Sequence, residues 1–158
     1  MAAIDVISLQ NARDWLVVDD NFDDTIITRL INSAVSWVEQ YTCYRLYARD
    51  ETFITTSCKT SLPYFPINSK SIKLKDDTDY TATNNTYFYA ALSLIVDCPI
   101  QSTITLNTGY TDPTQIPSPL LEACYKLITY LYENRDAYGT QLPIDIQILI
   151  NQFRRSIV

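Results

Sequence analysis

The stretch LLEACYKLITYLYENR, residues Leu120–Arg135, shows the longest unbroken helical periodicity in this chain. Its apolar side chains recur at intervals of three and four residues and form one broad face, which includes Leu120, Cys124, Leu127 and Leu131. Ser118 can cap the helix, and Pro119 can occupy its first position, where a missing N–H costs nothing. We therefore expect a central helix, within residues 117–138, whose apolar face another element must cover.

Two helical segments are expected near the N-terminus, within residues 1–44. Thr25–Tyr41 carries a second long apolar stripe, with Glu39 on its polar side, and is the expected packing partner of the central helix. A shorter helix precedes it. Ser8 is its cap candidate, and Ile7 can pack on Ala12 as a hydrophobic staple.

Pro143 opens a last helical segment, residues 143–158, with Arg154 near its end. Its apolar positions follow helical spacing and are Ile146, Leu149, Ile150, Phe153 and Ile157. A terminal amphipathic helix can close the core of its own domain, or it can bury its stripe on a partner. The sequence leaves both alternatives open.

Between the second helix and the central helix, in residues 45–110, the apolar period changes from about four to about two. Four strands are expected, at Leu46–Thr56, Ser71–Lys75, Thr86–Val96 and Ser102–Leu106. The prolines in Leu62–Ile67 exclude a helix and hold an extended segment at a sheet edge or outside the sheet. The predicted fold is α+β and mainly α: one domain of residues 1–158, with a helical bundle on two long helices, a β-rich insertion and a C-terminal helix.

Charge and composition exclude several classes of protein. The formal charge is −6 and there is no histidine, whereas a protein that grips DNA or RNA normally carries a basic stripe. No run approaches the ~18 apolar residues of a membrane span, and the N-terminus lacks the features of a secretory leader. The four cysteines are far apart, which favours buried free thiols in a reducing cytoplasm: Cys43, Cys58, Cys98 and Cys124.

No sequence pattern typical of an active site or a cofactor site is present. Without histidine, the commonest catalytic base and metal ligand is missing, and two glycines do not make a phosphate-binding loop. The acidic run Asp19–Asp24 lacks the alternating ligands and the distal glutamate of an EF-hand. We expect a protein that is not an enzyme and needs no metal or cofactor; a hydrolase built on a carboxylate pair is the catalytic alternative left open.

A set of short motifs occurs in a characteristic order along the chain. They are Val6-Ile7-Ser8-Leu9, Trp15-Leu16, Asp19-Asp20, Glu39-Gln40-Tyr41-Thr42, Leu62-Pro63 through Pro66-Ile67, Thr108-Gly109-Tyr110, Ile116-Pro117 and Leu131-Tyr132-Glu133-Asn134-Arg135. Their order and spacing resemble the phage head–tail connector family, also called head-completion or adaptor proteins, over nearly the whole chain. Where the family often has a glycine after Tyr-Thr, this chain has Cys43, so the usual left-handed end of the second helix is not expected.

The resemblance implies a structural virion protein of the phage neck, present in the host cytoplasm during assembly. Such a protein would form a ring of about a dozen copies and extend the DNA channel below the portal. Its partners would be the portal protein, a tail or stopper protein, and double-stranded DNA that passes without specific binding. The alternatives are a tail-completion or stopper protein of the neck, or a monomeric regulatory binding protein.

The same resemblance implies roles for three groups of residues. The portal would be contacted through Ile146, Leu149, Ile150, Phe153 and Arg154. The structural signature of the family would be Tyr132, Glu133, Asn134 and Arg135, of which Arg135 can serve the exposed helix carbonyls or reach a neighbouring subunit. Acidic residues would line the channel and repel phosphates, or else form solvated turns and caps: Asp19, Asp20, Asp76, Asp77 and Asp79.

Overall fold

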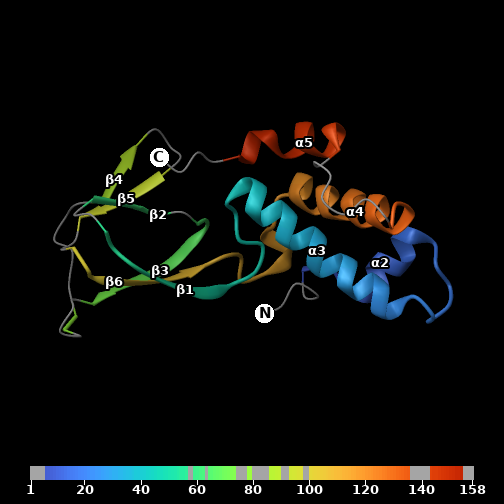
Figure 1. Cartoon of the computed structure of the whole chain (residues 1–158), viewed down its shortest axis with the longest axis horizontal. Coiled ribbons are helices and arrows are strands. Elements are labelled where there is room, and N and C mark those ends of the chain that lie inside the picture. The colour runs from blue at the N-terminus through green and yellow to red at the C-terminus, as the bar shows by residue number, and fades with distance from the viewer. Residues whose placement is uncertain are drawn as a thin grey trace. The chain divides into compact units, whose positions relative to one another are not determined.

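The chain divides into two compact units, one helical and one built from strands. The computed structural model describes residues 6–56, 59–62, 64–73, 78–79, 86–89, 93–97, 100–135 and 143–154. A helical unit comprises Met1–Tyr47 and Tyr110–Arg154, and a β unit comprises Ala48–Gly109 and Arg155–Val158. Figure 1 labels the helices and strands. The single domain of residues 1–158 stays a prediction.

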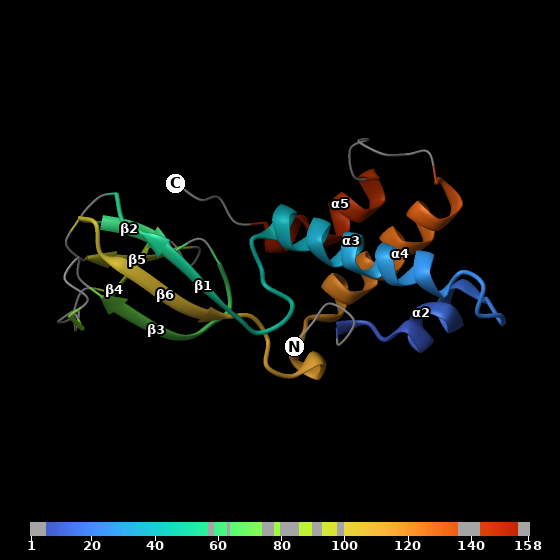
Figure 2. The same cartoon turned by 60° about the horizontal axis from the view of Figure 1, so that its bottom comes forward.

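The described part of the helical unit is built from four α-helices. They are α2 (Leu9–Leu16), α3 (Asp24–Thr42), α4 (Ser118–Glu133) and α5 (Ile144–Ile150), with short 3-10 turns η1 (Pro113–Gln115) and η2 (Asn151–Phe153). Helix α4 packs on α2, α3 and α5, and Figure 2 shows α3 and α4 side by side. The central segment is therefore a helix whose apolar face is covered, as predicted from its periodicity.

The core of the helical unit follows the predicted stripes. Side chains of α3 and α4 form its centre, among them Ile31, Val35, Leu120, Cys124 and Ile128, which are at most 1% exposed. Burial of one such aliphatic side chain contributes about 1.5–3 kcal/mol. The pairing of the two long apolar stripes is thus the main source of stability in this unit.

The ends of the helices both confirm and correct the predicted caps. Ser8 caps α2, because its hydroxyl accepts the N–H of Asn11 at 3.1 Å. Ser118 does not cap α4; it is the first residue of the helix, and Pro117 precedes it. The prediction at Cys43 was also wrong, because Cys43 adopts the left-handed conformation, with φ 61°, and its N–H bonds the Glu39 carbonyl oxygen at 2.9 Å.

The side chain of Glu39 is buried, although its position in the helical pattern predicted the polar side. It is 4% exposed, and its Oε1 accepts the N–H of Leu46 at 2.8 Å. Its Oε2 lies 3.6 Å from Nη1 of Arg45, which is also buried. Buried carboxylates need such partners. Glu39 therefore fixes the turn by which the chain leaves α3.

The β unit contains two three-stranded antiparallel sheets in its described part. In the first sheet β6 (Thr103–Thr108) lies between β1 (Arg49–Ile54) and β3 (Ile67–Lys73). In the second, β5 (Ser93–Asp97) lies between β2 (Lys59–Leu62) and β4 (Thr86–Tyr89). The insertion between α3 and α4 is thus β-rich, and the chain is α+β and mainly helical, as predicted.

The strand predictions need two corrections. The expected single strand Thr86–Val96 is two strands, β4 and β5, which pair with each other so that Tyr89 lies opposite Ser93. Strand β2 lies in a segment for which no strand was predicted. Apolar side chains at every second position indicate a strand with one buried face. They do not indicate where the chain turns back to form the next antiparallel strand.

Replacing Glu39 with alanine tests its role at the end of α3. Glu39→Ala should lower the free energy of unfolding by about 3 kcal/mol, because it removes the buried carboxylate that faces Arg45 and accepts the Leu46 N–H. The midpoint of urea denaturation measures the change. Gln40→Ala, at the neighbouring exposed position, is the matched control and should change stability by less than about 0.5 kcal/mol. Equal effects of the two substitutions would contradict this role.

Candidate functional site

The described residues offer little chemistry for catalysis. No group of three or more cysteine, aspartate or glutamate side chains that could hold a metal ion occurs among them. Cys124 is a buried free thiol, as predicted, and burial, with the nearby charge of Glu39, raises its pKa far above the usual value. Cys43 is free and half-buried, and Cys58 and Cys98 lie outside the described residues. No helix in the described chain is long and apolar enough to cross a membrane.

The signature at the end of α4 is tied to the start of α3. The hydroxyl of Tyr132 donates to Oδ2 of Asp23 at 2.5 Å, and Nη2 of Arg135 lies 3.5 Å from the same oxygen. The Arg135 guanidinium also lies 5.3 Å from the centre of the Tyr132 ring. The hydrogen bond to Asp23 raises the pKa of Tyr132, because the carboxylate favours the protonated hydroxyl that donates to it. Arg135 thus joins two helices of its own unit.

The other two signature residues have simpler surroundings. Asn134 ends the helix, since its backbone N–H and its side-chain amide both donate to the Tyr130 carbonyl oxygen, at 3.0 and 2.9 Å. Glu133 is exposed. The signature is therefore built around Asp23, Tyr132 and Arg135, and the sequence alone did not reveal Asp23 as their partner because it lies far away along the chain.

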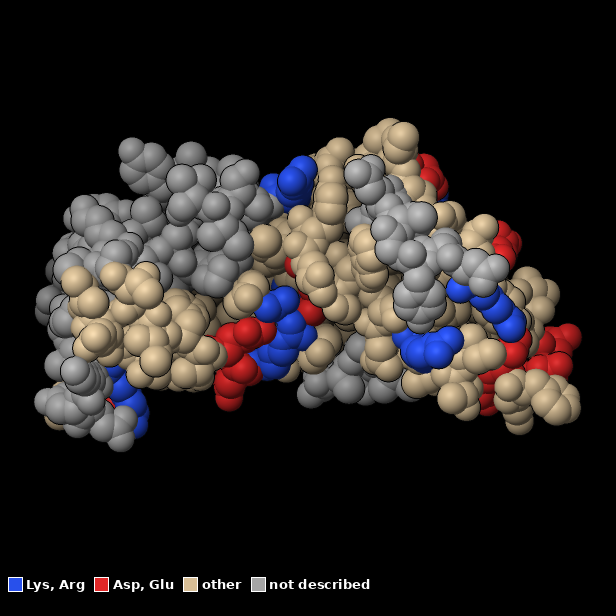
Figure 3. Space-filling model, viewed as in Figure 1, with Lys and Arg blue, Asp and Glu red and all other residues tan. Residues whose placement is uncertain are grey.

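Two of the five predicted channel residues, Asp19 and Asp20, lie in the connection between α2 and α3. Both are exposed, and Figure 3 shows acidic side chains gathered at this end of the helical unit. Asp79 lies in the β unit, where it forms an isolated bridge with Lys73. Asp76 and Asp77 lie outside the described residues. The five acidic residues therefore belong to different units of the chain.

The connection between α2 and α3 is held by Arg13. Its Nη2 donates to the carbonyl oxygens of Asp19 and Asp20 at 3.1 and 3.0 Å, and its Nε lies 3.6 Å from Oδ1 of Asp24. Oδ1 of Asp20 in turn accepts the N–H of Phe22 at 3.2 Å. One arginine thus fixes the backbone of the whole connection.

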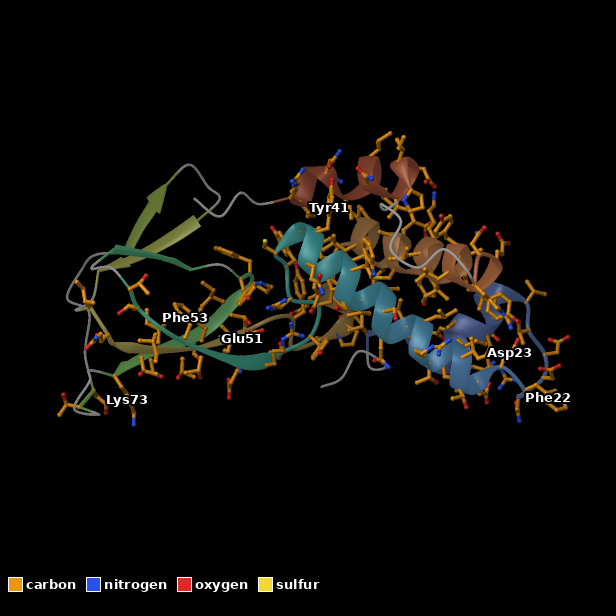
Figure 4. The ribbon with its side chains drawn as sticks, in the orientation of Figure 1. Phe22, Asp23, Tyr41, Glu51, Phe53 and Lys73 are labelled. Atoms are coloured by element: carbon orange, nitrogen blue, oxygen red, sulfur yellow. The ribbon has the colours of Figure 1, made fainter. Side chains whose placement is uncertain are left out.

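Two apolar side chains of this connection are exposed to solvent. Val17 is 83% exposed and Phe22 is 92% exposed, and Figure 4 shows Phe22 at the tip, directed away from the helices. Val17 also has a left-handed backbone, with φ 57° and ψ 46°, which a β-branched residue adopts at a cost. The connection therefore holds an apolar side chain in water at a position where glycine or asparagine is usual.

The predicted portal-contact residues of the terminal helix pack partly on their own unit. Ile146 and Ile150 are fully buried, and Leu149 and Phe153 pack against the core. Arg154 is exposed, and its guanidinium lies 5.2 Å from the centre of the Tyr41 ring. Of the two alternatives for the terminal helix, the structure shows it closing the core. Contact with a portal stays a prediction.

Helix α5 also exposes two isoleucines that are not among the predicted portal contacts. Ile144 is 75% exposed and Ile148 is 68% exposed. The sequence did indicate their exposure, because isoleucines two residues apart differ by about 200° around a helix and cannot share one face. Isoleucine alternates along Ile144–Ile150, so two of the four isoleucines must face away from the core.

Both the sequence and the fold of this chain are similar to those of known proteins. Residues 6–70, somewhat less than half of the chain, match the family model described as phage gp6-like head-tail connector protein. The resemblance to the head–tail connector family is confirmed. Comparison with curated proteins gives no significant match.

The fold of the whole chain is similar to that of proteins in solved particles of a gene transfer agent (GTA). A chain in the neck of an empty GTA particle, computed with C6 symmetry, matches with a TM-score of 0.78 and 18% identity, over 97% of this chain and 91% of that one. A chain in the virion of the native particle matches with a TM-score of 0.78 and 17% identity, over 100% and 94%. A chain in the native neck, computed with C12 symmetry, gives 0.75 and 19%, over 97% and 91%.

The motif Glu39-Gln40-Tyr41-Thr42, which lies within the residues that match the connector family model, has a structural role in this chain. Glu39 fixes the exit from α3, and the hydroxyl of Tyr41 donates to Oδ1 of Asn151 at 2.6 Å. Oγ1 of Thr42 donates to the Val38 carbonyl oxygen at 2.7 Å and accepts the N–H of Tyr44 at 3.2 Å. The motif therefore joins the end of α3 to the chain that follows it and to the C-terminal segment.

Glycine at position 17 tests the left-handed end of α2. Val17→Gly should raise the free energy of unfolding by about 1 kcal/mol, because it removes the Cβ conflict at a positive φ and gives up almost no buried surface. Cys43→Gly is a second test of the same effect. Cys43 ends α3 with a positive φ, so glycine at this position should also raise the free energy of unfolding. Thermal unfolding measures both. A lower melting temperature for Val17→Gly would contradict the strain at this position.

Proposed function

We propose that this protein is a structural component of a phage neck, a ring that connects the portal of the head to the tail and extends the DNA channel. The observation that supports it most strongly is the similarity of fold along essentially the whole chain to proteins of a particle neck, together with the connector family match at residues 6–70. Its partners in this proposal are the portal protein, a tail or stopper protein, further copies of itself and double-stranded DNA in transit. The protein has no catalytic role.

In this proposal the helical bundle built on α3 and α4 is the rigid body of one connector domain, and the β unit is its insertion. The insertion reaches from Ala48 to Gly109 and is built from hydrogen-bonded antiparallel strands, a framework that keeps its shape during assembly. The GTA necks were computed with C6 and C12 symmetry, which supports a closed ring for this chain as well.

Acidic residues line the channel in this proposal. Asp19, Asp20 and Asp79 are exposed, and the chain carries a formal charge of −6, so a ring of many copies would present a field that repels phosphates. A basic lumen would bind DNA through counterion release and slow its passage. Asp76 and Asp77 belong to the same group of proposed channel residues.

Particles assembled without this chain test the proposal. We expect heads that lack tails, because the joint between portal and tail would be missing, and electron microscopy of purified particles measures their fraction. In particles made with a tagged chain, the label should lie at the neck. Tailed particles formed in the absence of the chain would overturn the proposal, as would a tagged chain that never enters the particle.

The terminal helix is the proposed contact with the portal. Arg154→Glu should weaken binding to purified portal protein by about tenfold, because it reverses an exposed charge beside the end of α5 and leaves the buried isoleucines in place. Lys126→Glu makes the same charge change at an exposed position of α4 and should leave binding unchanged. Calorimetric titration measures the affinity. Equal affinities of wild type and Arg154→Glu would exclude this contact.

A further inference from the structure

We propose that the connection between α2 and α3 of one copy docks on the outer face of α3 of the next copy, with Phe22 against Trp37. This inference rests on the proposed function, since it names the contact between neighbouring copies in the ring. The two surfaces differ and lie on different parts of the helical unit. A contact between unlike surfaces is the kind that closes into a ring when repeated.

The first surface is an apolar tip with an acidic border. Val17 and Phe22 are the most exposed large apolar side chains of the chain's described residues, at 83% and 92%. Asp19 and Asp20 lie between them in sequence and are exposed, and Figure 3 shows the acidic cluster at this end. Arg13 and the Asp20 side chain already fix the backbone, so docking orders little further chain.

The second surface is an aromatic and basic stripe on α3. Arg29, Ser33 and Trp37 follow each other at intervals of four residues and so share one side of the helix. Trp37 is 40% exposed. Among the described residues, the guanidinium of Arg29 has no hydrogen bond or ion pair. Tryptophan and arginine are the residue types most enriched at the energetic centres of protein interfaces.

The two surfaces complement each other in charge and in polarity. The carboxylates of Asp19 and Asp20 can face the exposed guanidinium of Arg29, while Phe22 covers the exposed indole of Trp37. In this contact Asp19 and Asp20 lie between copies, so the channel lining proposed above would come from Asp76, Asp77 and Asp79. A further exposed apolar surface of the unit, Ile144 and Ile148 on α5, is a poorer match because Asp145 beside it carries the same charge as the acidic tip. The charges therefore favour docking of the tip on the stripe of α3.

The strain at Val17 has a consequence for this contact. Val17→Gly and Cys43→Gly both place glycine at a left-handed helix end, and both should stabilise the fold. Only Val17 lies in the docking tip. The first substitution should therefore weaken contact between copies although it strengthens the monomer, whereas the second should leave the contact unchanged.

A photo-crosslinking residue placed in particles tests the contact directly. With p-benzoylphenylalanine in place of Phe22, irradiation of purified particles should join two copies of this chain, and mass spectrometry should find the new bond within residues 29–40 of the second copy. Crosslinks to another protein, or to another region of this chain, would overturn the inference and leave the proposed function intact. A chain that is missing from the neck of purified particles would overturn both.

Reversing the charges on both surfaces distinguishes a lost contact from a misfolded chain, because a misfolded chain would not regain the crosslink. In particles that carry the crosslinking residue, Arg29→Asp should lower the yield of crosslinked dimer at least about fivefold, and adding Asp19→Lys, which leaves the bond between Asp20 and the Phe22 N–H in place, should restore at least half of it. Lys126→Asp, at an exposed position of α4, is the matched control and should not change the yield. Failure of the reversed charges to restore the crosslink would count against the contact between these two surfaces, as would an equal loss with Lys126→Asp.

Discussion

The buried carboxylate of Glu39 is the constraint on which the end of α3 and the backbone that follows it depend. It receives the backbone N–H of Leu46 and faces Arg45, so the residues just after α3 cannot continue the helix or move freely. A buried charge without these partners would cost several kcal/mol. The backbone just after α3 is therefore fixed as far as Leu46, within the helical unit.

Contacts between side chains far apart in sequence give the helical unit its second fixed point. Asp23 at the start of α3 holds Tyr132 and Arg135 at the end of α4, which aligns the two longest helices at one end. At the other end, Tyr41 bonds Asn151 and the ring of Tyr44 meets that of Phe153 edge-on, with 5.8 Å between the ring centres. These contacts tie the helical unit at both ends and so limit the movement of its helices against one another.

The connection between α2 and α3 presents two exposed acidic residues, Asp19 and Asp20, together with the exposed side chains of Val17 and Phe22. Helix α3 presents the exposed side chains of Arg29 and Trp37, about two helical turns apart. In the contact that we propose between copies, these charges would favour one register over others, because like charges that meet at a wrong register repel.

The sequence by itself determined the local features: the long helices Thr25–Tyr41 and Leu120–Arg135, the cap at Ser8 and the β-rich insertion, because periodicity and capping depend on neighbours within a few residues. Only the tertiary structure decided the features that depend on distant partners. Glu39 is buried because Arg45 and Leu46 fold back on it, and Arg135 pairs with Asp23 across the unit. Thr86–Val96 becomes two strands because β4 and β5 bond each other. Such partners meet only after the chain has folded, so no local pattern encodes them.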